Sequence, residues 1–175
     1  MADLNYGTGT GLNDSNSTTG YSYTALVDAS NIETFDGAGN VDTIKFYNNL
    51  ADGRLRIWKG TMSGLVFSFD DFTEDVDVDL TGKGTGWITV TAPTDFAAFA
   101  VDANTALLFY AHSTAATGTM FGRGNAGSLR YGYNAADPPY SGNLTMTVGA
   151  TLHRLEVKLE GVFVLSPQQS HQMIL

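Results

Sequence analysis

The chain of 175 residues contains no cysteine. A disulfide framework, a thiolate nucleophile and a Cys-ligated zinc or iron–sulfur centre are therefore excluded, while the redox compartment stays open. Charged residues make up only 15% of the chain, too few for a helical bundle, and hydrophobic residues make up 43%, too many for a disordered protein. Together with 20 glycines, this composition favours one all-β domain.

Basic residues are scarce, since 9 lysines and arginines stand against 18 acidic residues and the net charge is −9. Nucleic-acid binding depends on clustered basic side chains that release counterions, so we expect no nucleic-acid partner. No apolar run approaches the roughly 18 residues of a membrane span, and the opening MADLNYGTGT has neither a basic leader nor an apolar core. We therefore expect a soluble protein that starts at Met1 and has no membrane partner.

Hydrophobic and polar residues alternate along most of the chain with the period of two that is typical of strands. Turn-forming residues recur at the spacing expected of a sandwich or jelly roll, at 48–53, 59–64, 81–86 and 122–127. The alternating stretches predict antiparallel strands at 21–27, 41–47, 53–59, 65–69, 75–80, 86–92, 143–148 and 152–165, the last with Gly161 as a break. Four of their apolar residues are expected in the core: Phe46, Phe67, Val90 and Leu159.

One segment, 93–116, is rich in alanine, and Asp95 could cap a helix there. We nevertheless predict only a short turn near 94–99, followed by a strand through ALLFYAH.

The two ends differ from the middle of the chain. Residues 1–20 are mostly Gly, Thr, Asn and Ser, a composition that cannot order itself by burial, and 166–175 carry no strand pattern. The sequence therefore predicts an extended N-terminal arm at 1–20, a β-sandwich at 21–165 and a docked C-terminal tail at 166–175. We expect the arm to be held by a neighbouring chain or by the domain's own surface.

Acidic residues concentrate in DDFTEDVDVDL, residues 70–80. Alternation places Asp75, Asp77 and Asp79 on one strand face, which predicts a solvated face that also resists unwanted strand pairing. An EF-hand is excluded, because Leu80 stands where the turn glycine belongs and Gly86 stands where the bidentate glutamate belongs. Two alternatives stay open: a cation site in the turn before the strand, formed by Asp70, Asp71 and Glu74, and a catalytic carboxylate group.

Other motifs of catalysis or cofactor binding are incomplete. GKGTG at 82–86 lacks the first glycine and the Ser or Thr of a phosphate loop, and FGRGNAGS at 121–128 precedes no helix. Neither G-x-S-x-G nor H-E-x-x-H occurs, and His112, His153 and His171 are far apart. We expect no enzyme, no cofactor and no bound metal.

Aromatic residues offer one candidate binding site. Trp58, Tyr131, Tyr133 and Tyr140 could form a platform that stacks on a sugar ring. Trp58 is expected to share a strand face with Arg54 and Arg56. Such a face is also typical of a barrel rim or an intersubunit seam, which is the interpretation we favour, and a buried tryptophan is the third alternative.

The succession VDTIKFYN, GRLRIWKG, LVFSFDDF, GWITVTAP, VDANTALLFYAH and LEVKLEGVFV resembles single jelly-roll domains over roughly residues 21–165. Such domains occur in galactose-binding-like modules and in accessory structural proteins of virus particles, chiefly tailed phages. The resemblance lies in strand order and rhythm, and no ligand motif matches, so it transfers no binding residue. It implies a β-sandwich that either holds carbohydrate or builds and decorates a particle.

These observations lead to two functional hypotheses. The first is a non-enzymatic structural protein of the virion, assembled in the host cytoplasm: a capsid decoration or cement protein, or a tail, neck or fibre component. It would work as a homo-oligomer, exchange its arm, and contact other virion proteins such as capsid or tail protein. The alternative is a carbohydrate-binding, lectin-like module that uses the aromatic platform.

Overall fold

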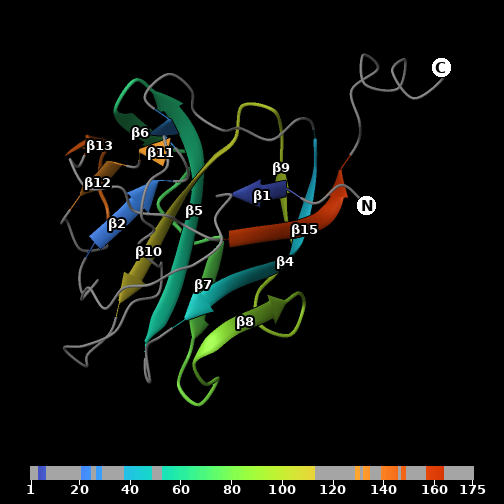
Figure 1. The fold of residues 1–175 in the computed structure, drawn as a ribbon. Coiled ribbons are helices and arrows are strands. Elements are labelled where there is room, and N and C mark those ends of the chain that lie inside the picture. The colour runs from blue at the N-terminus through green and yellow to red at the C-terminus, as the bar shows by residue number, and fades with distance from the viewer. Residues whose placement is uncertain are drawn as a thin grey trace.

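A computed structural model describes residues 4–6, 21–24, 27–28, 38–48, 53–112, 129–130, 132–134, 139–145, 147–148 and 157–163. Side chains are described for 38–46, 48, 53–110 and 139–145. Every regular element in these ranges is a β-strand, and every strand pair is antiparallel (Figure 1). Over the same ranges, no helix has the length and apolar character needed to cross a lipid bilayer.

A five-stranded sheet contains both early and late segments of the chain. Its order is β1 (Leu4–Tyr6), β15 (Val157–Phe163), β4 (Gly39–Asn48) and β8 (Gly86–Thr91), and β9 (Phe99–Val101) pairs with β4 beyond the end of β8. The register of β15 against β4 shifts between Glu160 and Gly161, which confirms the predicted break at that glycine.

An eight-stranded sheet is built around β5 (Arg54–Ser63) and β10 (Ala106–His112), and the whole of β10 pairs with residues 54–60 of β5. On its other side β5 pairs with two strands that lie end to end, β7 (Val76–Asp79) and β6 (Val66–Phe69). The remaining strands are β13 (Leu144–Thr145), which pairs with β6, and β2 (Tyr21–Thr24), β12 (Gly132–Asn134) and β14 (Thr147–Val148), which follow β10. A separate pair joins β11 (Leu129–Arg130) to β3 (Val27–Asp28).

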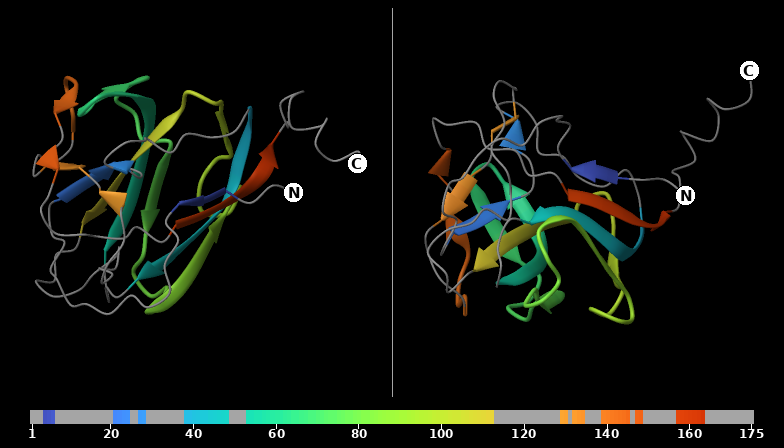
Figure 2. Two further views of the ribbon diagram at one scale, coloured as in Figure 1. Left: turned by 45° about the horizontal axis from the view of Figure 1, so that its top comes forward. Right: turned by 60° about the horizontal axis from the view of Figure 1, so that its bottom comes forward.

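The two large sheets form a sandwich-like arrangement, visible as two layers in the left view of Figure 2. The main core comes from the alternation of their strands: one face of β4 and β8 and one face of β5, β7 and β10 are buried. Its residues are Ile44, Phe46, Ile88, Val90, Leu55, Ile57, Val76, Val78, Leu107 and Phe109. An all-β, antiparallel sandwich is thus confirmed.

Three of the four predicted core residues, Phe46, Phe67 and Val90, are fully buried. The side chain of the fourth, Leu159, lies outside the described residues, although its Cα pairs with that of Ile44. The predicted strand through ALLFYAH is β10, and residues 92–95 form a turn.

The turn predicted at 59–64 is wrong except at its last residue, because β5 continues through Gly60 to Ser63. Gly60 lies opposite Phe69, and a Cβ at this position would come within 2.2 Å of the Ser68 carbonyl oxygen and 2.7 Å of the Phe67 ring. The glycine therefore permits a close approach inside a strand. The chain turns only at Gly64, whose φ is 59°.

Candidate functional site

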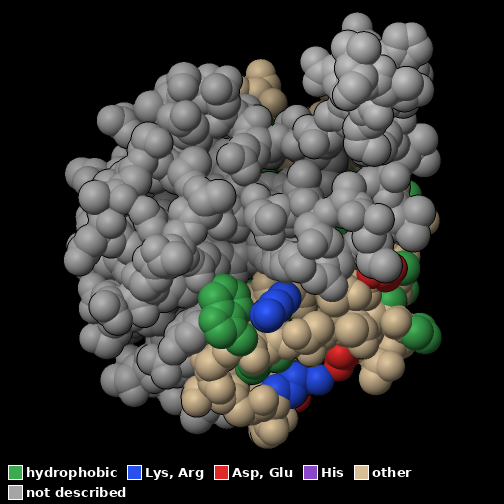
Figure 3. Space-filling model, turned by 45° about the vertical axis from the view of Figure 1, so that its right-hand side comes forward, with side chains coloured by type: hydrophobic (Ala, Val, Ile, Leu, Met, Phe, Trp, Pro, Cys, Tyr) green, Lys and Arg blue, Asp and Glu red, His purple; other side chains and the backbone are tan. Residues whose placement is uncertain are grey.

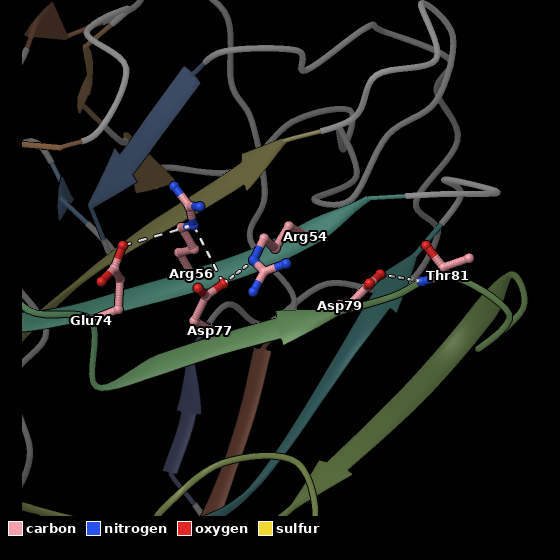
Figure 4. A network of polar contacts seen from close by, with 6 residues as sticks. All are labelled: Arg54, Arg56, Glu74, Asp77, Asp79 and Thr81. Carbon is pink, nitrogen blue, oxygen red and sulfur yellow. Dashed lines mark hydrogen bonds and ion pairs between the residues drawn. The ribbon is translucent and has the colours of Figure 1, made fainter.

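The outer face of the eight-stranded sheet is the face that carries Arg54, Arg56 and Trp58, opposite to the main core. Its charged end is drawn in Figure 4, where Asp77 of β7 lies between the two arginines of β5. Arg54 Nε donates a hydrogen bond to Asp77 Oδ1, and Arg56 Nε lies 3.4 Å from the same oxygen and 3.8 Å from Glu74 Oε1. Two basic side chains thus alternate with acidic ones across paired strands.

This charged end largely confirms the expectation for the acidic stretch. Asp77 and Asp79 are exposed, while Val76 and Val78 between them are buried. The hydrogen bond with Asp77 raises the pKa of Arg54. The N–H of Thr81 donates to Asp79 Oδ1 over 2.9 Å and lowers the pKa of that carboxyl. The face is solvated, and the arginines of the neighbouring strand β5 offset part of its negative charge.

Asp75 departs from the expectation, because it precedes β7 and its side chain is only 18% exposed. Asp75 Oδ2 accepts a hydrogen bond of 2.7 Å from the Lys59 N–H, and Lys59 Nζ lies 3.4 Å from its Oδ1. Burial raises the pKa of the Asp75 carboxyl, and the contacts with Lys59 oppose that shift. Asp75 therefore fastens the start of β7 to β5.

The alternative cation site in the turn before β7 receives no support from the side chains. Asp71 Oδ1 accepts the N–H of Thr73 over 2.8 Å, and Glu74 faces Arg56. Among the residues with a described placement, no group of three or more His, Asp or Glu side chains is arranged to hold a metal ion.

The other end of the outer face is an apolar cluster with an aromatic centre. Its buried members are Trp58, Phe67, Ala106, Leu108, Tyr110, Tyr140 and Leu144. The rings of Trp58 and Tyr140 lie 5.0 Å apart at 71°, and Phe69 stacks on Tyr140 at 5.1 Å. The indole Nε1 of Trp58 donates to the Phe72 carbonyl oxygen over 3.3 Å.

The aromatic cluster decides among the three interpretations of Trp58. Its side chain is 1% exposed and that of Tyr140 is 6% exposed, so both rings lie inside the protein. The favoured interpretation of Trp58 as part of a rim or seam is wrong, because 139–144 and the 70–75 turn pack over this end of the sheet. The structure brings together Trp58 and Tyr140 of the predicted sugar platform; Tyr131 and the side chain of Tyr133 lie outside the described residues.

The large hydrophobic side chains that the described residues expose are Leu65 at 39%, Phe72 at 48% and Trp87 at 52%. Trp87 lies on the outer face of the five-stranded sheet, where Lys45 Nζ is 5.7 Å from its ring centroid. On the face drawn in Figure 3, hydrophobic, basic and acidic side chains are scattered among uncharged ones. Trp87 was not among the candidate binding residues predicted from the sequence, although the alternation of GWITVTA already places it on the face opposite to Ile88 and Val90.

The two ends of β8 are tied together by an ion pair. Lys83 precedes the strand and Asp95 follows it, and Lys83 Nζ lies 2.6 Å from Asp95 Oδ1. Asp95 Oδ2 also accepts the N–H of Thr91 over 2.9 Å. These contacts, the one with Lys83 first, lower the pKa of the Asp95 carboxyl. Within β8 itself, Gly86–Thr91, there is no charged residue.

The far edge of the five-stranded sheet involves the predicted arm. Leu4–Tyr6 form β1 and pair with β15, with Leu4 opposite Leu159 and Tyr6 opposite Val157. This part of the arm is therefore held by the domain's own sheet, one of the two possibilities expected from the sequence.

Comparisons of the chain with protein-family models, with curated proteins and with solved structures give no match.

Proposed function

We propose that this chain is a non-enzymatic structural protein of a virus particle, built on a jelly roll and working as a homo-oligomer in the virion. It would serve as a capsid decoration or cement protein, or as a tail, neck or fibre component. The resemblance in strand order motivates this proposal, and the antiparallel sandwich is compatible with it.

One observation carries the proposal: a short strand from the start of the chain, β1, completes the edge of a sheet formed by much later segments. Adding a strand to a sheet edge is a common way in which extended segments bind proteins, because backbone hydrogen bonds supply the affinity. An arm of this kind suits a subunit that fastens itself to its neighbours.

The test is removal of the arm. Deleting residues 1–20 removes a three-residue edge strand, whose hydrogen bonds contribute about 1 kcal/mol each. The domain should stay folded with a melting temperature lowered by a few degrees, while self-association, followed by sedimentation velocity, is lost. Unchanged association would contradict the proposal, as would a truncated and a full-length chain that are both monomers at all concentrations.

A matched pair of variants separates backbone pairing from arm composition. Proline cannot donate a backbone hydrogen bond, and the N–H groups of successive strand residues point to opposite sides. Leu4→Pro with Asn5→Pro therefore removes whichever N–H faces β15, whereas Leu4→Ala with Asn5→Ala keeps both. The proline pair should lose association and the alanine pair should retain more of it.

A further inference from the structure

The strand β1 is joined to the rest of the domain in a way that permits exchange between copies. It ends at Tyr6, and the next described strand, β2, begins at Tyr21 in the other large sheet. Fourteen residues, 7–20, connect the two strands, and twelve of them are Gly, Thr, Asn or Ser. Fully extended, a connection of this length spans up to about 46 Å.

The acceptor of β1 is the same in every copy of the chain. Leu4, Asn5 and Tyr6 pair with Leu159, Lys158 and Val157 of β15, a strand whose other side is occupied by β4. If β1 leaves its own β15 and a second copy's β1 takes its place, the same three residue pairs form again. Exchange of an identical element conserves its contacts, so it is a low-cost route to oligomers.

We propose that, in the assembled state, Leu4–Tyr6 of one copy pairs with β15 of a second copy in the register observed within the single chain. This inference rests on the proposed function and specifies its contact: the donor is β1, the acceptor is the outer edge of β15, and the partner is a second copy. Once the bodies of two copies touch, the arm acts at high effective concentration.

Engineered cysteines test the exchange without background, because the natural chain contains no cysteine. Asn5 and Lys158 are Cα partners, and facing residues of an antiparallel pair lie about 4.5–5.5 Å apart, within the range that a disulfide bridges. Asn5→Cys chains and Lys158→Cys chains are mixed in equal amounts, allowed to assemble, oxidised with oxidised glutathione and separated on a non-reducing gel. The matched control replaces Lys158→Cys by Thr89→Cys, which lies on β8 at the opposite edge of the sheet.

We expect a covalent dimer of Asn5→Cys and Lys158→Cys chains in the assembled fraction and none with the Thr89→Cys chains. A chain that carries both Asn5→Cys and Lys158→Cys should become cross-linked between copies when assembled. Assembled protein whose double variant forms only intrachain disulfides, or none, would overturn the exchange and leave the proposed function standing. Absence of any assembled fraction in sedimentation would overturn the proposed function and the exchange with it.

Discussion

At Gly60, in the middle of β5, there is no room for a methyl group. Because a Cβ would lie 2.2 Å from the Ser68 carbonyl oxygen, Gly60→Ala must push β5 and β6 apart or distort both. We expect a loss of about 1–3 kcal/mol in the free energy of unfolding, measured by urea denaturation. Gly142→Ala is the control, since a Cβ there meets nothing within 4 Å. This substitution should change the free energy of unfolding by less than about 0.5 kcal/mol. Equal stability of the two variants would contradict the close approach.

A second prediction at the scale of single residues concerns Asp95. Its pKa lies below the ordinary aspartate value of about 3.9 because its charge is bonded to Lys83 and to the Thr91 N–H. The charged form therefore stabilises the fold above that ordinary value, and this contribution disappears as the pH falls through the lower folded-state pKa. Asp95→Asn keeps an oxygen for Thr91 but loses the charge.

The Asp95→Asn variant should melt below the natural protein at neutral pH, and the difference should shrink as the pH falls through the lowered folded-state pKa of Asp95, because the natural side chain then loses its charge as well. Asp70→Asn is the control, since Asp70 is exposed and no ion pair joins it to another described residue. The melting temperature of Asp70→Asn should differ little from that of the natural protein at neutral pH. A difference for Asp95→Asn that does not shrink on acidification would show that the contribution of Asp95 does not depend on its charge.

At the scale of elements, the pairing of β5 with β7 joins opposite charges across two alternating strands. Arg54 and Asp77 are 42% and 33% exposed, so solvent screens their attraction, and a double-mutant cycle with Arg54→Ala and Asp77→Ala should give a coupling of about 0.2–1 kcal/mol. The coupling should shrink further in 1 M salt, where the Debye length is about 3 Å. A coupling that salt does not change would mean that the contact is not mainly electrostatic.

The same two strands show what could be predicted from the sequence. GRLRIWK and DVDVD each alternate, so their exposed faces could be assigned, and complementary charge was the available signal that they pair. The position of Trp58 could not be predicted in this way, because alternation places it with Arg54 and Arg56 and says nothing of what covers the face. The cover comes from residues 139–144, which are remote from β5 in sequence, and from the 70–75 turn, which reaches Trp58 only because β6 pairs with β5.

At the scale of the whole molecule, the eight-stranded sheet is buried on both faces over part of its area. β5 carries Ile57 on the main core and Trp58 in the aromatic cluster, and β10 carries Phe109 and Leu108 in the same manner. Since both clusters share these backbones, loss of one should unfold the other.

We therefore expect Phe46→Ala in the main core and Phe67→Ala in the aromatic cluster each to cost about 3–5 kcal/mol. Both should lower the midpoint of one cooperative transition, followed by circular dichroism and tryptophan fluorescence together. Thr89→Ala, at an exposed position of β8, is the control and should change little. Two separate transitions, one of which responds only to Phe67→Ala, would mean that the clusters unfold independently.

The sandwich class could be predicted because strand alternation is a local signal. The order of strands in the sheets could not, since it depends on pairings between distant segments: β4 has β15 on one side and β8 and β9 on the other. Trp87 is different, because the alternation of GWITVTA alone places it on the face opposite to Ile88 and Val90.

The arrangement of β1 and β15 also has a mechanical consequence. Leu4 lies opposite Leu159 and Tyr6 opposite Val157, so the chain enters β1 at the same end of the ladder from which β15 runs on towards Phe163. A force that pulls the start of β1 away from the C-terminal end of β15 therefore breaks the backbone hydrogen bonds between the two strands one after another, which is the unzipping geometry. The arm then peels off at low force, while the longer ladders of β15 with β4 and of β4 with β8 bear no load until it has gone.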